Sequence, residues 1–189
     1  MGVITISRQM GSQGSQLAQQ VAQRLSWRRV GRELINQAAL TAGVPQVALA
    51  EIDELGLFGL RPTAKDRRAY LRQVEIIITD LAYQGNVVIV GRGGQVILRD
   101  RPDAFHVRIV APLQTRVKWF QQEKQISEQA ARACLIESDQ VRARYLKQNY
   151  KVGVNDPNMY HLVINTGFWR LTQASTILAQ SYQAWLGVN

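Results

Sequence analysis

Cysteine and acidic residues are scarce in this sequence of 189 residues, and it contains no long hydrophobic run. The single cysteine, Cys134, excludes an internal disulfide and a zinc site of clustered cysteines, and its helical surroundings predict a buried thiol. No stretch approaches the roughly 18 consecutive apolar residues of a membrane span. The first residues also lack the basic, apolar and small segments of a signal peptide. We therefore expect a cytoplasmic protein that does not span a membrane.

The few acidic residues are unevenly placed. The 14 Asp and Glu are outnumbered by 23 Lys and Arg, a formal charge of +9, and 18 of the basic residues are arginines. No acid precedes Glu33, none lies between Asp139 and Asp156, and none follows Asp156. Arginine binds phosphate through a planar fork of donors. The acid-free stretches therefore predict a phosphate-bearing ligand; the alternative is a basic surface that keeps the protein soluble or binds nucleic acid weakly.

Hydrophobic patterning predicts strands that alternate with helices. Runs such as Val3–Ser7 and Val87–Val90 are continuous and rich in β-branched residues, as buried parallel strands are. The other predicted strands are 28–31, 105–110 and 160–164, and the predicted helices begin near residues 15, 34, 63, 95, 112, 127 and 171. This order predicts a single α/β domain over 1–189 with three layers and a five-stranded parallel sheet.

One segment departs from this alternation. Residues 47–60 mix helical and loop signals, and the stretch 56–62 predicts a loop with exposed apolar tips. Its Leu57 and Phe58 are candidates for a contact in a homodimer.

A glycine-containing loop, residues 8–15, joins the first strand to the first helix. Parallel sheets bind ligands at the carboxyl ends of their strands, and backbone amides beside a helix N-terminus attract anions. Gly11 and Gly14 therefore predict a phosphate site, the alternative being a tight turn that needs glycine only for its backbone conformation. Ser15 is the expected cap of the helix.

Several motifs together resemble the cytidylate kinase-like family of P-loop nucleoside monophosphate kinases. They are VITISRQMGSQGSQLAQQVAQRL from Val3, GRELI from Gly31, VVIVGRGG from Val87, LRDRP from Leu98, DQVRARY from Asp139 and DPNMYHLVINT from Asp156. The resemblance spans nearly the whole chain in the right order. It implies a P-loop kinase-like fold with a helical NMP-binding insert, about 32–84, and a lid, about 127–155. It also implies ATP and Mg²⁺, and nucleotides as partners.

The family motif carries over to the first loop with one departure. The standard phosphate-binding loop reads G-x-x-x-x-G-K-[ST], and here Gly14 stands at the lysine position and Ser15 at the hydroxyl that holds magnesium. The family commonly lacks this lysine and reads Gly-Ser-Gly-Gly, so Gln13 is the real difference. By resemblance, the phosphate-binding residues are Gly11, Ser12, Gln13, Gly14 and Ser15. Arg8 is the candidate for the missing positive charge.

The acceptor and lid residues follow from the same resemblance. Arg92 resembles the arginine that holds the acceptor phosphate, and Arg32 lies in the matching GRELI segment. Gly31 and Gly93 stand where the family or cytidylate kinases proper carry aspartate. The lid candidates are Asp139, Arg142, Arg144 and Lys147, with Arg142 and Arg144 as catalytic clamps.

The helical spacing of the lid residues supports two further expectations. Arg144, Lys147 and Lys151 share one helix face, and Asp139 is placed to orient Arg142 one turn away. The alternative is a solvated basic face.

Three functions follow, in order of support. The first is phosphoryl transfer from ATP to a nucleoside monophosphate, with CMP as the leading acceptor. The second is a degenerate relative that binds a nucleotide or phosphate without turnover, and the third is a nucleic-acid binder, supported by charge alone. Asn165 and Thr166 are a weak hint of a binding loop, and His106 and His161 are expected to be structural.

Overall fold

A computed structural model describes residues 2–45 and 63–187, so the predictions made for 47–60 and for the 56–62 loop lie outside the described residues. The elements follow one another as β1 (Val3–Arg8), α1 (Gly14–Leu25), β2 (Arg28–Val30), α2 (Arg32–Thr41), α3 (Ala64–Gln84), β3 (Val87–Val90), α4 (Gly94–Ile97), β4 (Ala104–Val110), α5 (Leu113–Lys124), α6 (Glu128–Tyr150), the 3-10 helix η2 (Pro157–Met159), β5 (Leu162–Asn165) and α7 (Leu171–Leu186).

The five strands form one parallel sheet in the order β2-β3-β1-β4-β5, which confirms the predicted fold class. β1 lies at the centre, with Ile6 beside Val90 of β3 and Ser7 beside Arg108 of β4. Because all strands run the same way, their carboxyl ends share one edge, where the loops after β1 and β3 lie close together.

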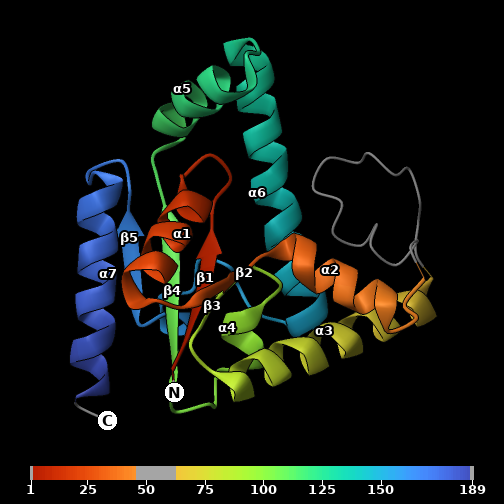
Figure 1. Cartoon of the computed structure of the whole chain (residues 1–189). Helices are drawn as coiled ribbons and strands as arrows, with labels where there is room; N and C mark the ends of the chain where they lie inside the picture. Colours follow the sequence, from red (N-terminus) through yellow and green to blue (C-terminus); the bar gives the residue numbers. More distant parts are fainter. Residues whose placement is uncertain (1, 46–62, 188–189) are drawn as a thin grey trace.

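Successive residues of the central strands face opposite layers, as the pleat of a strand requires. Val3 and Ile89 pack with residues of α2, α3, α4 and α6 on one face. Ile4 and Val88 pack with α1 and α7 on the other. Helices therefore cover both faces, and Figure 1 shows the resulting three layers. The continuous apolar runs of the sequence have this cause.

Local signals explain the boundaries of α3. Thr63 and Asp66 form a reciprocal capping box at the start of α3, and Gly85 follows its end with φ of 67°. The prediction that Ser15 caps α1 is wrong, since the helix begins at Gly14 with Gln13 as its N-cap. Helix α5 begins at Leu113 with Pro112 as its N-cap, close to the predicted start.

Helices α5 and α6 form a hairpin that projects beyond the carboxyl edge of the sheet (Figure 1). Val117, Phe120, Ala131 and Leu135 make its own apolar cluster, and Cys134 packs against them half-buried rather than buried as predicted. The hairpin thus includes α5, which the expected lid range of 127–155 does not; that range remains a prediction.

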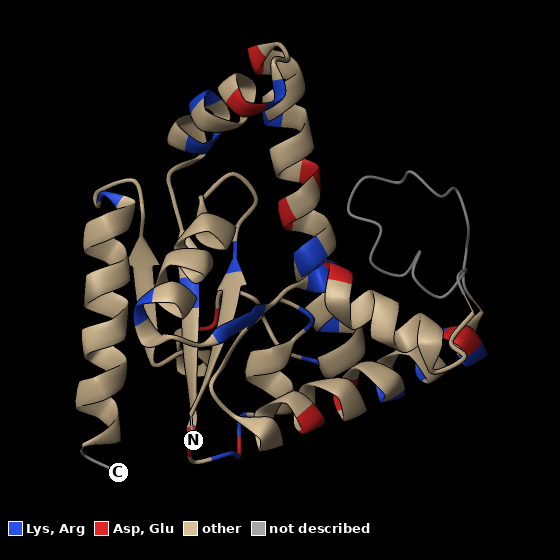
Figure 2. Ribbon diagram, viewed as in Figure 1, with Lys and Arg blue, Asp and Glu red and all other residues tan. Residues whose placement is uncertain are grey.

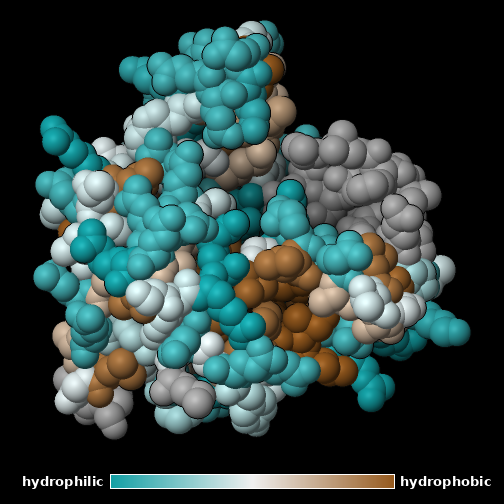
Figure 3. All heavy atoms as spheres, viewed as in Figure 1, coloured by the Kyte–Doolittle hydropathy of each residue, from teal (hydrophilic) through white to brown (hydrophobic). Residues whose placement is uncertain are grey.

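The face seen in Figure 3 is mostly hydrophilic, with hydrophobic side chains gathered where α2, α3 and α4 meet. Leu34 of α2 and Ile76 of α3 are among the exposed large apolar residues. Within 2–45 and 63–187, no helix has the length and apolar content needed to cross a membrane.

Candidate functional site

The loop between β1 and α1 has the backbone geometry of an anion site. Gly11 and Gln13 are left-handed, with φ of 72° and 57°, and Ser12 between them is not. Alternating left- and right-handed residues turn successive N–H groups toward one concavity. The first turn of α1 follows directly, where N–H groups lack partners within the helix. The Ser12 amide already donates to the Gln9 carbonyl at 3.4 Å, so the amides left to a ligand are the others of this loop and those at the N-terminus of α1.

Side-chain hydrogen bonds hold the backbone of this loop in place. The buried Ser12 hydroxyl donates to the Gln9 carbonyl at 2.8 Å, and the buried Thr166 hydroxyl donates to the Ser12 carbonyl at 2.8 Å. Asn165 accepts a hydrogen bond from the Gly167 amide. The contacts of Asn165 and Thr166 are therefore structural, and Thr166 acts on the candidate site through the loop backbone.

A broad groove, here called the loop groove, lies between this loop and the α5–α6 hairpin. Its volume is about 590 Å³, within the range of small-molecule sites. It is lined by Arg8, Gln9, Met10, Gly11, Gln13, Gly14, Ser15, Gln16, Trp119, Phe120, Gln122, Glu123, Lys124 and Arg142. Ser15 is exposed in the first turn of α1, so its hydroxyl is available to a ligand in the groove.

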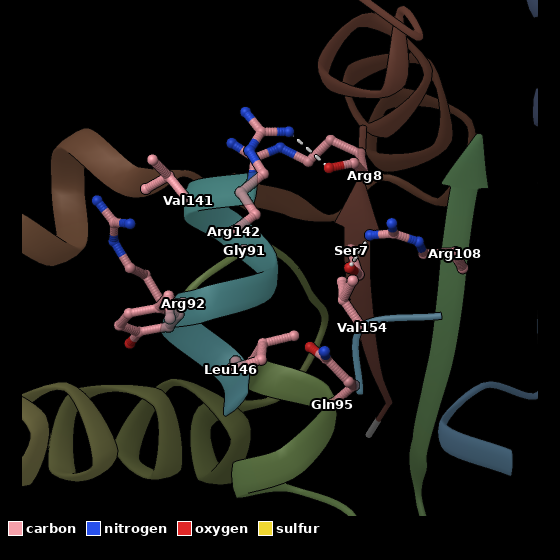
Figure 4. A pocket seen from close by; sticks show the side chains of 12 residues that line it. Ser7, Arg8, Gly91, Arg92, Gln95, Arg108, Val141, Arg142, Leu146 and Val154 are labelled. Atoms are coloured by element: carbon pink, nitrogen blue, oxygen red, sulfur yellow. Dashed lines mark hydrogen bonds between the residues drawn. The ribbon is translucent and has the colours of Figure 1, made fainter. Parts of the chain in front are cut away.

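A second, smaller cavity, here called the arginine cavity, lies between the ends of β1 and β3, strand β4 and helix α6 (Figure 4). Its volume is about 50 Å³, enough for a few waters or a phosphate group but not for a nucleotide. It is lined by Ser7, Arg8, Gly91, Arg92, Gly93, Gln95, Arg108, Val141, Arg142, Tyr145, Leu146 and Val154. This lining contains four arginines and no carboxylate.

Arg8 and Arg142 line both spaces. An Nη of Arg8 lies 2.6 Å from where a Cβ on Gly91 would stand, so its guanidinium covers the backbone at the end of β3. Arg142 donates to the carbonyl of Arg8 at 2.6 Å, which ties α6 to the end of β1 (Figure 4). The structure thus places these two predicted residues together, on the boundary between groove and cavity.

Arg92 reaches the arginine cavity from a strained turn after β3. It is itself left-handed, with φ of 58°, between two left-handed glycines. Its side chain is buried and donates to Asn36 at 3.4 Å, while its Nε has no hydrogen-bond partner. Tyr70 donates to the same Asn36 oxygen at 3.2 Å, and burial raises the pKa of Tyr70, which keeps its phenol protonated.

The departure from aspartate at Gly93 has a physical cause. Gly93 has φ of 72°, and a Cβ there would stand 2.9 Å from the Tyr150 ring. An aspartate at this position would therefore be strained and would collide with Tyr150.

Arg108 is a cavity residue that the sequence analysis missed. It lies on β4, 6% exposed, and donates to the Ser7 hydroxyl at 2.8 Å and to the Asn155 side chain at 3.3 Å. Its Nε has no hydrogen-bond partner, and burial lowers the pKa of its guanidinium. The usable signal was an arginine in the middle of the apolar run Phe105–Val110.

Arg116 is a second missed residue, and it is a partner of Asp139. The carboxylate of Asp139 accepts from Arg116 at 2.8 Å, and its expected role in orienting Arg142 stays a prediction. Arg116 is almost fully buried and also donates to the carbonyls of Ala111 and Met10. The pair therefore links α5, α6 and the loop after β1.

Besides Ser12 and Asp139, three predicted site residues line neither space. Arg144 and Lys147 are exposed on α6, as is Lys151 on the same face. Arg32 forms an ion pair with its neighbour Glu33 at 3.4 Å. A backbone hydrogen bond at the start of α2, aided by the charges of Arg32 and Arg8, lowers the pKa of Glu33 and keeps it ionised.

The two histidines have structural partners. His106 shares a 2.8 Å hydrogen bond with the Thr5 hydroxyl, and its amide donates to His161 at 2.8 Å. Burial lowers the pKa of His106 to about 4. Among residues 2–45 and 63–187, no group of three or more His, Cys, Asp or Glu is placed to hold a metal ion.

The charge distribution agrees with this geometry. In Figure 2, Lys and Arg segments meet at the carboxyl edge of the sheet, where the end of β1, the start of α2 and the lower half of α6 come together. Helix α7 on the far side carries no charged residue between Leu171 and Leu186.

The chain is similar in sequence and in fold to several known proteins. A profile of the cytidylate kinase-like family matches residues 3–167. The cytidylate kinase of Methanocaldococcus jannaschii is 26% identical over 183 residues, covering 95% of this chain and 96% of that protein. A crystal structure of an uncharacterized protein from Eubacterium ventriosum has a TM-score of 0.79 at 20% identity, covering 97% and 99% of the two chains. Shikimate kinase from Bacteroides thetaiotaomicron has a TM-score of 0.59 at 10% identity, covering 96% and 98%. The sheet and its flanking helices thus have the fold of P-loop kinases.

Proposed function

The chain belongs to the cytidylate kinase-like family, and we propose that it transfers the γ-phosphoryl group of ATP to a nucleoside monophosphate. CMP is the leading acceptor, because the matched curated relatives include cytidylate kinases. The observation that carries the proposal is that Arg8 and Arg142 stand on the boundary between a nucleotide-sized groove and a phosphate-sized cavity. A phosphoryl group in transfer would occupy this boundary.

The loop groove suits the donor. The amides of Gly11 and of residues 13–15 would hold the β- and γ-phosphates, and the partial charge of about +0.5 at the α1 N-terminus adds to their attraction. Arg8 would supply the charge that a lysine gives in the standard loop. Mg²⁺ fits this groove through the exposed Ser15 hydroxyl together with the phosphate oxygens, and when bound it neutralises charge on those oxygens.

The arginine cavity suits the phosphate of the acceptor. In the transfer, an acceptor phosphate oxygen forms a bond to the γ-phosphorus as the bond to the ADP oxygen breaks. Arg92 would hold the acceptor, and Arg8 and Arg142 would neutralise charge on the equatorial oxygens. The cavity holds only about 50 Å³, so an acceptor nucleoside requires the α5–α6 hairpin to move. Arg144, Lys147 and Arg32 would contribute only after such a movement.

The direct test is an assay of ADP formation with ATP, Mg²⁺ and a panel of acceptors. The panel contains CMP, UMP, AMP and GMP, with cytidine as the matched control that lacks the phosphate. We expect CMP to raise ADP formation above the rate with ATP alone, CDP to appear as product, and cytidine to have no effect. An unchanged rate with every monophosphate contradicts the proposal.

A second candidate is a relative that binds nucleotide without turnover, favoured by the Gln13 side chain in the loop groove. Stabilisation of the protein by ATP without any ADP formation supports it. Salt-sensitive binding to unrelated oligonucleotides, without a response to nucleotides, supports the third function instead.

A further inference from the structure

Arg108 is a buried cation that neutral groups hold in place. It is 6% exposed in the middle of a parallel sheet, and no ion pair among residues 2–45 and 63–187 includes it. Its hydrogen bonds go to two neutral groups, the Ser7 hydroxyl and the Asn155 amide oxygen. A buried charge without a counter-ion is costly, so such residues are normally paired.

The geometry around Arg108 indicates what would compensate this charge. Its guanidinium extends from β4 toward Ser7 at the floor of the arginine cavity (Figure 4). Arg92, also buried and outside every ion pair of the described residues, lies on the same cavity from the β3 side. Each of the two has an Nε without an acceptor. The guanidinium of Arg92 turns toward Asn36, on the other side of α6 from Arg108 in the view of Figure 4, so Arg108 is the buried cation that faces this space from the sheet.

We propose that Arg108 is a substrate-binding residue, which holds the phosphate of a phosphate monoester acceptor from the sheet side. The proposal rests on the proposed function for the identity of the reaction, but the anion site itself is independent of turnover. Because the cavity has no carboxylate to balance its arginines, it selects a dianionic phosphate over a carboxylate or a neutral hydroxyl. Arg108 thus adds a specificity contact.

Arg108→Met tests this role, because a purely structural arginine and a binding arginine predict opposite results. Removing an uncompensated buried charge leaves the ligand-free protein equally or more stable, whereas removing a structural arginine lowers its melting temperature. The binding probe is CMP, with inorganic phosphate as the minimal probe, titrated by calorimetry with a non-hydrolysable ATP analogue in the loop groove. The matched control is Arg24→Gln, an exposed arginine in the last turn of α1.

We expect Arg108→Met to weaken CMP and phosphate binding on the order of ten- to a hundredfold, as loss of a charge-assisted contact does, with affinity for the ATP analogue unchanged. Cytidine should bind the variant and the wild type equally. Equal CMP affinity in the variant and the wild type overturns the proposal. If the Met variant does not fold, Arg108→Lys decides: it keeps the charge but loses the fork, so binding at least tenfold weaker is expected and wild-type affinity overturns the proposal.

The same experiment separates this proposal from the kinase assignment. If phosphate binds the wild type through Arg108 but no ADP forms, the anion site is supported and the proposed kinase activity is refuted. ADP formation with an unchanged KM for CMP in Arg108→Met supports the kinase and refutes the role of Arg108.

Discussion

Asp139→Asn is expected to destabilise the protein by breaking its most buried ion pair among the described residues. Arg116 is 4% exposed and donates to Asp139 at 2.8 Å. Two unit charges about 4 Å apart attract by about 4 kcal/mol at an effective dielectric constant of 20. Asp139 is 31% exposed, so solvent screening reduces this contribution, and we expect a loss of about 2 kcal/mol. For a chain of this length that corresponds to a fall of roughly 4–8 °C in Tm.

The assay is urea and thermal unfolding of Asp139→Asn beside the wild type. Asp100→Asn is the matched control, because Asp100 also accepts from an arginine, but in a pair whose side chains are 64% and 88% exposed. We expect this control to change stability by less than about 0.5 kcal/mol. Equal effects of the two substitutions would refute the argument that burial makes the Arg116 pair important.

The same substitution should loosen the loop after β1. Arg116 also donates to the Met10 carbonyl at 3.1 Å, and a Cβ on Gly11 would lie 3.3 Å from the Arg116 Cβ. Without the carboxylate charge, Arg116 is a buried cation that lacks a counter-ion, and its hold on the loop weakens. Amide hydrogen exchange at residues 11–14 should accelerate in Asp139→Asn and not in Asp100→Asn.

Three further predictions concern single side chains. Burial lowers the pKa of His106 to about 4, below its value of 6.5 in an unfolded chain, so the unfolded state binds the extra proton. Stability should therefore fall by about 3 kcal/mol as the pH drops from 6.5 to 4, and His106→Asn should flatten the dependence in acid unfolding curves; an unchanged slope counts against this origin. Gln13→Gly relieves a left-handed side chain at a cost in backbone entropy, so we expect stability within about 1 kcal/mol of the wild type and tighter ATP binding by calorimetry; weaker binding would contradict an obstructing Gln13. Thr166→Val removes the donor to Ser12 and should cost about 1–2 kcal/mol and raise the KM for ATP, whereas Thr176→Val on the surface of α7 should do neither.

Much of the architecture follows from local sequence signals that do not depend on the tertiary structure. Continuous β-branched runs predict buried parallel strands, and the structure contains strands at all five predicted places. The long helix α3 begins after Thr63, whose side chain caps the first turn, and ends before Gly85, whose backbone readily adopts a positive φ. Both signals act locally and can be read from the sequence. The boundary at Ser15 was wrong because the left-handed Gln13 takes the cap position, and that conformation depends on the packing of the loop.

The candidate site was predictable only where a motif carried it. Arg8, Arg92 and Arg142 lie in segments that resemble a family, and they meet at one cavity. Arg108 and Arg116 lie outside the motifs quoted for that resemblance, and their importance comes from burial and partners 23 to 106 positions away. Helical spacing predicted that Asp139 lies one turn from Arg142. Spacing along one helix cannot predict a contact with a residue of another helix, such as Arg116 of α5.

The sequence alone determined that strands alternate with helices around a parallel sheet, and that two segments are rich in arginine and poor in acids. Both features can be read from short stretches of neighbouring residues. Only the tertiary structure decided which arginines share a cavity and which face solvent. Arg108 and Arg144 are the same residue type, yet one lies in the sheet without a counter-ion and the other is exposed on α6. The energetic weight of a charge depends on the dielectric and the partners around it, which chain folding supplies.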